Sequence, residues 1–196
     1  MVSPVPLQVL RRARSEEPMQ SPPKPLDEVQ RIAALRNLLL LDTPPERRFD
    51  QLTAYATAYF EVPIALVSLV DANRQWFKSR CGLGATETGR DVSFCGYTIL
   101  QDGVMVIEDA LADPRFAENP LVVGEPRIRF YAGAPLTLPD GQRVGTFCLI
   151  DRIPRTLAPT AVEHLVRLAA VTVQELQGIP ASDEFLRERG FRVVDS

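Results

Sequence analysis

Three cysteines, Cys81, Cys95 and Cys148, are the residues of this sequence best suited to covalent chemistry. A thiol reacts as the thiolate, and redox chemistry needs a second thiol close enough to pair with it. Cys148 falls inside a predicted strand, Cys81 lies at the end of another, and no basic partner for Cys95 is evident. We therefore expect small buried residues that are neither catalytic nor disulfide-bonded, and we assign no catalytic residue.

Other residues give little support for a metal or phosphate site. The one histidine, His164, lies on a predicted helix beside a capping box. Haem or metal binding would need histidine or several thiols, and the sequence has no glycine-rich phosphate loop of the Walker type. We assign no metal ligand, and the cofactor is unknown.

A pocket in this chain would be built from aromatic, cationic and thiol side chains. Lys78, Arg127 and Arg129 could offer positive charge to an anionic ligand such as a cyclic nucleotide. Aromatic residues in such positions are more often plain core, but they can also line a cavity. The candidate ligand-binding residues are Trp76, Lys78, Phe94, Cys95, Phe116, Arg129, Phe130, Tyr131 and Cys148.

The stretch from Arg129 to Asp151 must position several of these candidates. It reads as two apolar strands joined at Pro139-Asp140-Gly141, and Asp-Gly between extended runs is a strong hairpin signal. The first strand has one set of side chains on each face: Phe130, Ala132, Ala134 and Leu136 against Tyr131, Gly133 and Pro135. The second divides into Val144, Thr146, Cys148 and Ile150 against Gly145, Phe147 and Leu149. Neither strand has a polar face, so both faces must be covered.

Amphipathic helices and further strands surround this hairpin. Helices are predicted at 27–41, 43–60 and 160–177, each with a capping-box spacing at its start. Strands are predicted at 63–71, 75–80 and 104–108, and a short helix at 93–100. Residues 81–91 read as a loop, and 109–124 as a mostly irregular connection with turns at Asp113-Pro114 and Asn119-Pro120.

This order predicts an α+β fold built on an antiparallel sheet. The three helices can cover one face, and the irregular segments 81–103 and 109–128 can cover the other. Irregular segments pack less closely than a helix layer, so we expect a pocket between them and the sheet. The strand alternation leaves open whether the Phe130 set or the Tyr131 set faces that pocket.

Composition sets the broad class. The chain of 196 residues is 45% hydrophobic and 24% charged, as in an ordinary soluble globular protein, and suits one domain with tails. We divide it into a Pro-rich disordered leader at 1–25, a domain at 26–178 and a charged tail at 179–196. A net charge of −3 does not suit a general nucleic-acid binder. No run is long enough to span a membrane and no signal peptide is evident, so with three unpaired cysteines we expect a cytoplasmic protein.

Seven strings in the same order resemble the GAF domain, a sensory module related to PAS domains. They cover roughly residues 27–177 and read LDTPPE at 41–46, IALVSLVD at 64–71, QWFKSR at 75–80, SFC at 93–95, DPRF at 113–116, RFYAGAPL at 129–136 and GTFCLID at 145–151. The resemblance implies a six-stranded antiparallel sheet with helices on one face, a small-molecule pocket among the loops on the other, and signalling through the terminal helices. GAF domains usually act on a kinase, phosphatase or cyclase domain, for which this chain has no room after residue 177. We expect a free-standing sensor or one that acts on a partner chain.

Family members with other chemistry provide the alternatives. Some GAF proteins reduce free methionine sulfoxide with pocket cysteines, and some bind a bilin through a cysteine commonly followed by histidine. Gly96 follows Cys95 here, which disfavours the bilin. We expect a non-enzymatic sensory domain that binds an unidentified small molecule. The alternatives are a methionine sulfoxide reductase-like enzyme and a scaffold with a collapsed pocket.

We also expect a homodimer and a separate output protein, with no nucleic-acid or membrane partner. The apolar surfaces of the first and last helices are wider than one sheet face needs, through Ala34 and Leu40 in the first and Ala161 and Leu168 in the last. Helix-to-helix pairing between two copies would cover that surplus.

Overall fold

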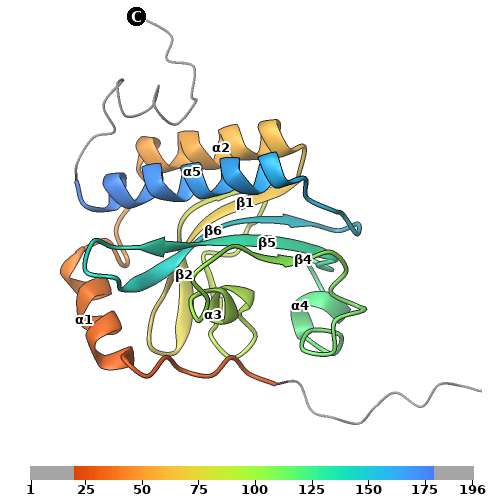
Figure 1. Cartoon of the computed structure of the whole chain (residues 1–196), viewed down its shortest axis with the longest axis horizontal. Helices are drawn as coiled ribbons and strands as arrows, with labels where there is room; N and C mark the ends of the chain where they lie inside the picture. The colour runs from red at the N-terminus through yellow and green to blue at the C-terminus, as the bar shows by residue number, and fades with distance from the viewer. Residues whose placement is uncertain (1–19, 179–196) are drawn as a thin grey trace, which may run out of the picture.

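A six-stranded antiparallel sheet organises the molecule, whose computed structural model describes residues 20–178 (Figure 1). The strands are β1 (Ile64–Val70), β2 (Arg74–Cys81), β3 (Glu87–Gly89), β4 (Met105–Ile107), β5 (Phe130–Thr137) and β6 (Arg143–Asp151). Their spatial order is β3-β2-β1-β6-β5-β4, which puts β1 and β6 at the centre. The predicted α+β fold with six antiparallel strands is confirmed.

Helices lie on both sides of this sheet. They are α1 (Glu28–Asn37), α2 (Arg47–Phe60), α3 (Phe94–Thr98), α4 (Pro120–Val123) and α5 (Pro159–Leu176). Helices α2 and α5 lie side by side over one face, and the short α3 and α4 lie with the connecting segments under the other (Figure 1). The prediction put all three long helices on one face, but α1 lies at one end of the sheet instead.

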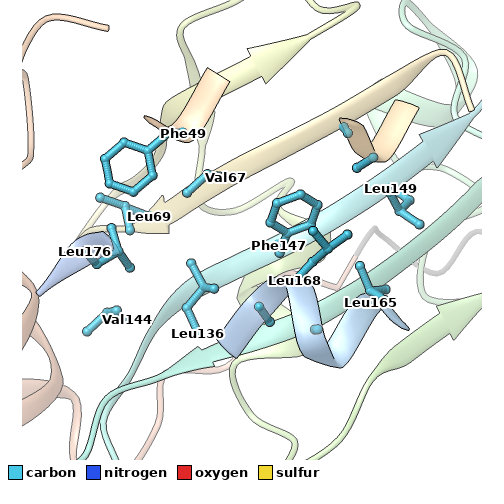
Figure 2. Close-up of a cluster of buried hydrophobic side chains, with 14 of the residues drawn as sticks. Phe49, Val67, Leu69, Leu136, Val144, Phe147, Leu149, Leu165, Leu168 and Leu176 are labelled. Carbon is cyan, nitrogen blue, oxygen red and sulfur yellow. The ribbon is translucent and has the colours of Figure 1, made fainter. Parts of the chain in front are cut away.

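Each face of the sheet has its own apolar core. In β1, Ala65, Val67 and Leu69 belong to the cluster under α2 and α5, whereas Leu66 and Val70 belong to the cluster on the loop face. Figure 2 shows the helix-side cluster, with Phe147 and Leu149 of β6 directed toward α5 residues. Because successive side chains of a strand alternate, two fully buried faces require the continuous apolar runs seen in the sequence.

The predicted hairpin is present, with Gly141 in the left-handed region at φ 86°. The structure also settles which set of side chains faces which way. Phe130 and its set lie in the helix-side cluster, and Tyr131 lies in the loop-side cluster. Val144 is an exception to the predicted alternation, because it joins the helix-side cluster and not the face of Cys148.

The prediction missed one strand, misplaced the end of the first helix and began the second helix at residue 43, whereas α2 begins at Arg47 with Glu46 as its N-cap. Residues 81–91, predicted as a loop, contain the edge strand β3, which pairs with β2. The first helix ends at Asn37 and not at residue 41, and Leu39 and Asp42 then take positive φ values of 53° and 59°. Residues 20–25 of the predicted leader have no helix or strand, while 1–19 and the predicted tail at 179–196 lie outside the described residues.

Helix α1 is held by a charged network as well as by part of the predicted apolar stripe, in which Leu35 is fully buried. Val29 is 80% exposed, whereas Arg31 is 1% exposed. Arg31 donates through Nη1 to the Val70 carbonyl oxygen at 2.6 Å and through Nε to Glu28 at 2.8 Å. The buried Arg90 also pairs with Glu28. Burial alone would raise the pKa of Glu28, but hydrogen bonds from Arg31 and Arg90 outweigh it and lower that pKa to about 2.

Leu165→Ala should destabilise the fold by roughly 2–5 kcal/mol, because Leu165 is fully buried between α5 and the sheet and its loss leaves a cavity. The measurement is urea denaturation followed by circular dichroism. Val166→Ala, one residue away on the same helix but 50% exposed, is the matched control and should change stability by less than about 0.5 kcal/mol. Equal losses from both variants would contradict this assignment of the core.

Glu28→Gln should destabilise the protein at neutral pH and not at low pH. The folded pKa of about 2 lies below the ordinary 4.5, so the ionised Glu28 contributes stability above pH 4.5 that is lost as pH falls toward 2. Removal of the carboxylate should therefore cost on the order of 2–3 kcal/mol at pH 7 and little at pH 2. Denaturation curves across this pH range test it, with the exposed Glu118→Gln as control. A pH-independent loss would refute the role given to the Glu28 charge.

Candidate functional site

A pocket of about 330 Å³ lies on the loop face of the sheet, where the sequence predicted one. Its floor comes from β1, β2, β5 and β6, and its walls come from α3 and the segments that follow β2 and α4. Leu66, Gln75, Phe77, Gly82, Leu83, Gly84, Ala85, Thr88, Phe94, Cys95, Leu121, Glu125, Pro126, Ile128, Tyr131, Ile150 and Arg152 line it. The exposed Gly84, Ala85, Glu125 and Arg152 mark its mouth.

Gln75 is the best-held polar group of the lining. It is 5% exposed, and its Nε2 donates to Thr88 Oγ1 on β3 at 2.6 Å. Its Oε1 accepts from Ser93 Oγ at 2.6 Å, and Ser93 Oγ in turn accepts from the Gly96 backbone N–H at 2.9 Å. This chain of hydrogen bonds fixes the amide and ties β2 and β3 to the first turn of α3.

Two thiols meet at the floor of the pocket. Cys95, on the first turn of α3, lies with its Sγ 3.9 Å from the Sγ of Cys148 on β6. Thr146 donates to the Cys95 sulfur at 3.0 Å and Tyr131 donates to it at 3.5 Å. The Tyr131 hydroxyl is itself hydrogen bonded to Thr98 Oγ1 at 2.8 Å. Both cysteines are buried, and Cys95 alone of the two lines the pocket.

The absence of a side chain at Gly133 on β5 makes room for this arrangement. This glycine pairs with Cys148 across β5 and β6. A Cβ at position 133 would lie 2.2 Å from the Tyr131 hydroxyl, so only glycine lets that phenol lie across the strand toward Cys95.

The electrostatics of the two sulfurs differ. Burial opposes ionisation of Cys95, but hydrogen bonds to its sulfur, first from Cys148 and then from Thr146, outweigh burial and hold the pKa of Cys95 below its ordinary value. The hydrogen bond between the two sulfurs, together with burial, raises the pKa of Cys148. Cys95 is thus the sulfur that ionises first, and Cys148 the one that stays protonated.

Three of the nine predicted ligand-binding residues, Phe94, Cys95 and Tyr131, line this pocket. Two more lie one layer behind them on the same face. Phe116 stacks on Phe94 with ring centroids 4.0 Å apart, and Cys148 lies behind Cys95. Whether these residues bind a ligand stays a prediction.

The other four predicted residues lie away from this pocket, and each has a structural reason. Phe130 and Trp76 face α2 and α5, because the alternation of their strands directs them there. The buried Lys78 pairs with Glu46 at 2.6 Å and reaches Thr43 at 2.6 Å. Arg129 donates to the backbone carbonyls of Val122 and Ile128, both at 2.9 Å. Trp76 and Lys78 line a separate cavity of about 630 Å³. Whether any of these four residues binds a ligand stays a prediction.

The sequence analysis also missed lining residues and the thiol pair. Gln75 stands at the start of the string QWFKSR, from which Trp76 and Lys78 were predicted as ligand-binding residues instead. Thr88 belongs to the missed strand β3. The sequence did not place a second thiol beside Cys95, because 53 residues separate it from Cys148 and only the docking of α3 on β6 brings the two sulfurs within 3.9 Å. Within the described residues all three cysteines are free thiols.

Neither a metal-ligand cluster nor a membrane-spanning helix is found in the part of the chain that the structure describes. Among residues 20–178, no cluster of three or more histidine, cysteine or acidic side chains could hold a metal ion. Within the same range, none of the helices has the length and apolar character needed to cross a membrane.

Known structures with a similar fold include both GAF domains and enzymes. The GAF domain region of a Geobacter sulfurreducens protein has a TM-score of 0.54 at 16% identity, covering 77% of this chain and 97% of that one. The free methionine-R-sulfoxide reductase of Neisseria meningitidis, solved with its substrate, has a TM-score of 0.56 at 17% identity, covering 74% of this chain and 87% of the reductase. At these identities the likeness shows the fold alone.

A curated relative is much more similar in sequence. It is a cyclic di-GMP phosphodiesterase of Pseudomonas aeruginosa, 46% identical over 170 residues. The match takes in 85% of this chain but 29% of the relative, so the chain spans less than a third of that protein's length. Because this relative is an enzyme, the expectation of a non-enzymatic protein is wrong: a region 46% identical to this chain occurs within a phosphodiesterase.

The sequence profile of the GAF domain matches residues 44–176, which is more than half of the chain. The matched range runs from the start of α2 to the end of α5 and includes all six strands. Both the helix-covered face and the pocket face of the sheet lie within it. The chain belongs to the GAF domain family.

Proposed function

We propose that this GAF domain is the sensory part of a cyclic di-GMP phosphodiesterase, and that a small molecule bound in the pocket sets the activity of that enzyme. The observation that carries the proposal is the 46% identity to a curated phosphodiesterase, over 85% of this chain. The catalytic part would be supplied either by another region of the same protein or by a partner chain. A compact pocket on the loop face supports the sensory half of the proposal.

The pocket favours a ligand other than cyclic di-GMP. A space of about 330 Å³ is at the small end for ligand sites. A cyclic dinucleotide, with two purines, two riboses and two phosphates, exceeds it and would need several cations. Arg152 is the only cationic residue among those that line the pocket, and the exposed Glu125 lines the same mouth. A small, mostly apolar molecule that hydrogen bonds to Gln75 and Tyr131 fits the lining better.

The contacts of the N-terminal segment offer one route from the pocket to the rest of the protein. A Cβ on Gly96 of α3 would lie 2.6 Å from Pro22, so this segment is in close contact with the helix that carries Phe94 and Cys95. Helix α1 follows directly and is joined through Arg31 to the end of β1. A ligand that displaces α3 would therefore act on the chain that leads into α1.

A filled pocket tests the proposal. Leu121→Trp should place a larger ring in the cavity and exclude the ligand, whereas Leu111→Trp, at an exposed site outside the lining, makes the same change without filling it. Mass spectrometry of small molecules released from protein purified out of its own cells should find one compound with the wild type and the Leu111 variant. The Leu121 variant should lose it, with at least about a tenfold weaker affinity. Cellular cyclic di-GMP should then change for Leu121→Trp alone.

Two results would contradict the proposal. Release of the same compound from all three proteins would remove the pocket from the mechanism. No released compound, together with cyclic di-GMP levels that do not respond to either variant, would favour the ligand-free scaffold instead. Melting temperatures of both variants show whether each is folded, and a bound ligand must raise that temperature.

We also propose a cytoplasmic homodimer, on changed grounds. Leu40 and Leu168, from which the dimer was expected, are buried within the subunit. Helices α2 and α5, which lie together, instead expose apolar side chains that include Tyr59 and Val166, at 51% and 50% exposure (Figure 1). The three free thiols fit a reducing compartment. Light scattering at tens of micromolar should give a dimer mass, and Val166→Asp should reduce it. A monomer mass for the wild type would oppose the dimer.

A further inference from the structure

We propose that Cys95 and Cys148 form a redox site that takes a small hydroperoxide from the pocket and closes to a reversible disulfide. The inference goes beyond ligand sensing and does not depend on which ligand the pocket binds. It assigns different roles to the two sulfurs, with Cys95 as the attacking thiolate and Cys148 as the resolving thiol.

The distance between the sulfurs supports disulfide formation. At 3.9 Å the two Sγ atoms are in contact, and bond formation requires an approach of roughly 2 Å to reach a disulfide length. Cys148 is held in the centre of the sheet by pairing on both sides of β6. Cys95 is on a short helix outside the sheet, so the movement falls on α3.

The groups around Cys95 support its role as the attacking thiolate. A cysteine that only fills space in a core needs no hydrogen-bond donors. Thr146 and Tyr131 both direct hydroxyl groups at this sulfur, and they would stabilise negative charge on it. The depressed pKa of Cys95 agrees with that geometry. The third thiol, Cys81, has one hydroxyl neighbour, Thr57, at 3.6 Å and lies at the end of β2.

Access from the pocket decides which of the two cysteines reacts first. Cys95 lines the pocket of about 330 Å³, while Cys148 is 0% exposed and lies behind it. A water molecule occupies about 30 Å³ of liquid volume, and a small hydroperoxide is only modestly larger, so it can enter this space. An oxidant therefore meets Cys95 first.

The chemistry balances with the hydroperoxide as the only oxidant. The Cys95 thiolate attacks the outer oxygen; an S–O bond forms, the O–O bond breaks, and the leaving oxygen takes the proton from Cys95 and departs as alcohol, or as water from hydrogen peroxide. Cys95 is then a sulfenic acid. The Cys148 sulfur attacks it; the S–S bond forms, the S–O bond breaks, and hydroxide leaves with the Cys148 proton as water. Two thiols are oxidised by two electrons, and one hydroperoxide is reduced.

Hydrogen peroxide added to the reduced protein tests the site. One equivalent should lower the free thiol count from three to one, peptide mapping should join Cys95 to Cys148, and dithiothreitol should restore all three thiols. Cys81→Ser is the matched control and should form the same disulfide. Cys148→Ala should stop at a Cys95 sulfenic acid that dimedone traps. Thr146→Val, which removes one donor, should slow the oxidation roughly tenfold, the effect of one pKa unit on the thiolate population well below the thiol pKa.

Other outcomes would overturn the proposal. Three thiols that stay reduced after peroxide treatment would refute the site, and so would oxidation of Cys81 in preference to Cys95. Mapping of the wild-type protein needs no variant, so a variant that fails to fold does not decide the result. Free methionine sulfoxide with a dithiol reductant is a separate arm. Sustained turnover to methionine would make the pair the centre of a reductase and would replace the hydroperoxide site.

Discussion

The close pairing of β1 with β6 is the constraint on which both faces of this domain depend. These two strands run through the centre of the sheet, and every residue of β1 is buried. A Cβ at Gly145 would lie 2.0 Å from the Ser68 carbonyl oxygen, so the strands approach this closely only because position 145 is glycine. The next residue along β6, Thr146, then reaches Cys95, and Phe147 points into the helix-side core.

The two faces meet this constraint in different ways. Helices α2 and α5 present regular apolar surfaces, and the cluster in Figure 2 fills the space between them and the sheet. The loop face is covered by α3, α4 and irregular chain, which pack through individual contacts such as the stacked rings of Phe94 and Phe116. A layer of this kind leaves a cavity where no side chain reaches the sheet, and the pocket beside Gln75 and Cys95 is that cavity.

The sequence predicted what depends on local pattern. Continuous apolar runs predicted the central strands, and Asp140-Gly141 predicted the hairpin. The strands are apolar on both faces but the helices can cover only one, which predicted a pocket on the loop face. The sequence did not predict the face of the sheet on which Tyr131 lies. Side-chain alternation sorts the residues of a strand into two sets, but it does not say which set faces the helices. At α1 the apolar pattern predicted the buried Leu35 but not the buried Arg31, which pairs with Glu28 and ties the helix to β1.

The contact between Cys95 and Cys148 shows why site chemistry was harder to predict than fold. Neither cysteine has a nearby sequence neighbour that activates it; the donors come from Tyr131 on β5 and Thr146 on β6, and the orientation of Tyr131 depends on the missing side chain at Gly133. The same short helix that holds Cys95 contacts Pro22, and Ser93 at its start holds Gln75 in the pocket. A change at the sulfur or in the pocket can therefore reach the N-terminal segment through α3. Because α3 has five residues and lies outside the hydrogen-bonded sheet, the pocket, the Cys95 sulfur and the N-terminal segment meet at an element that takes no part in the central pairing of β1 and β6.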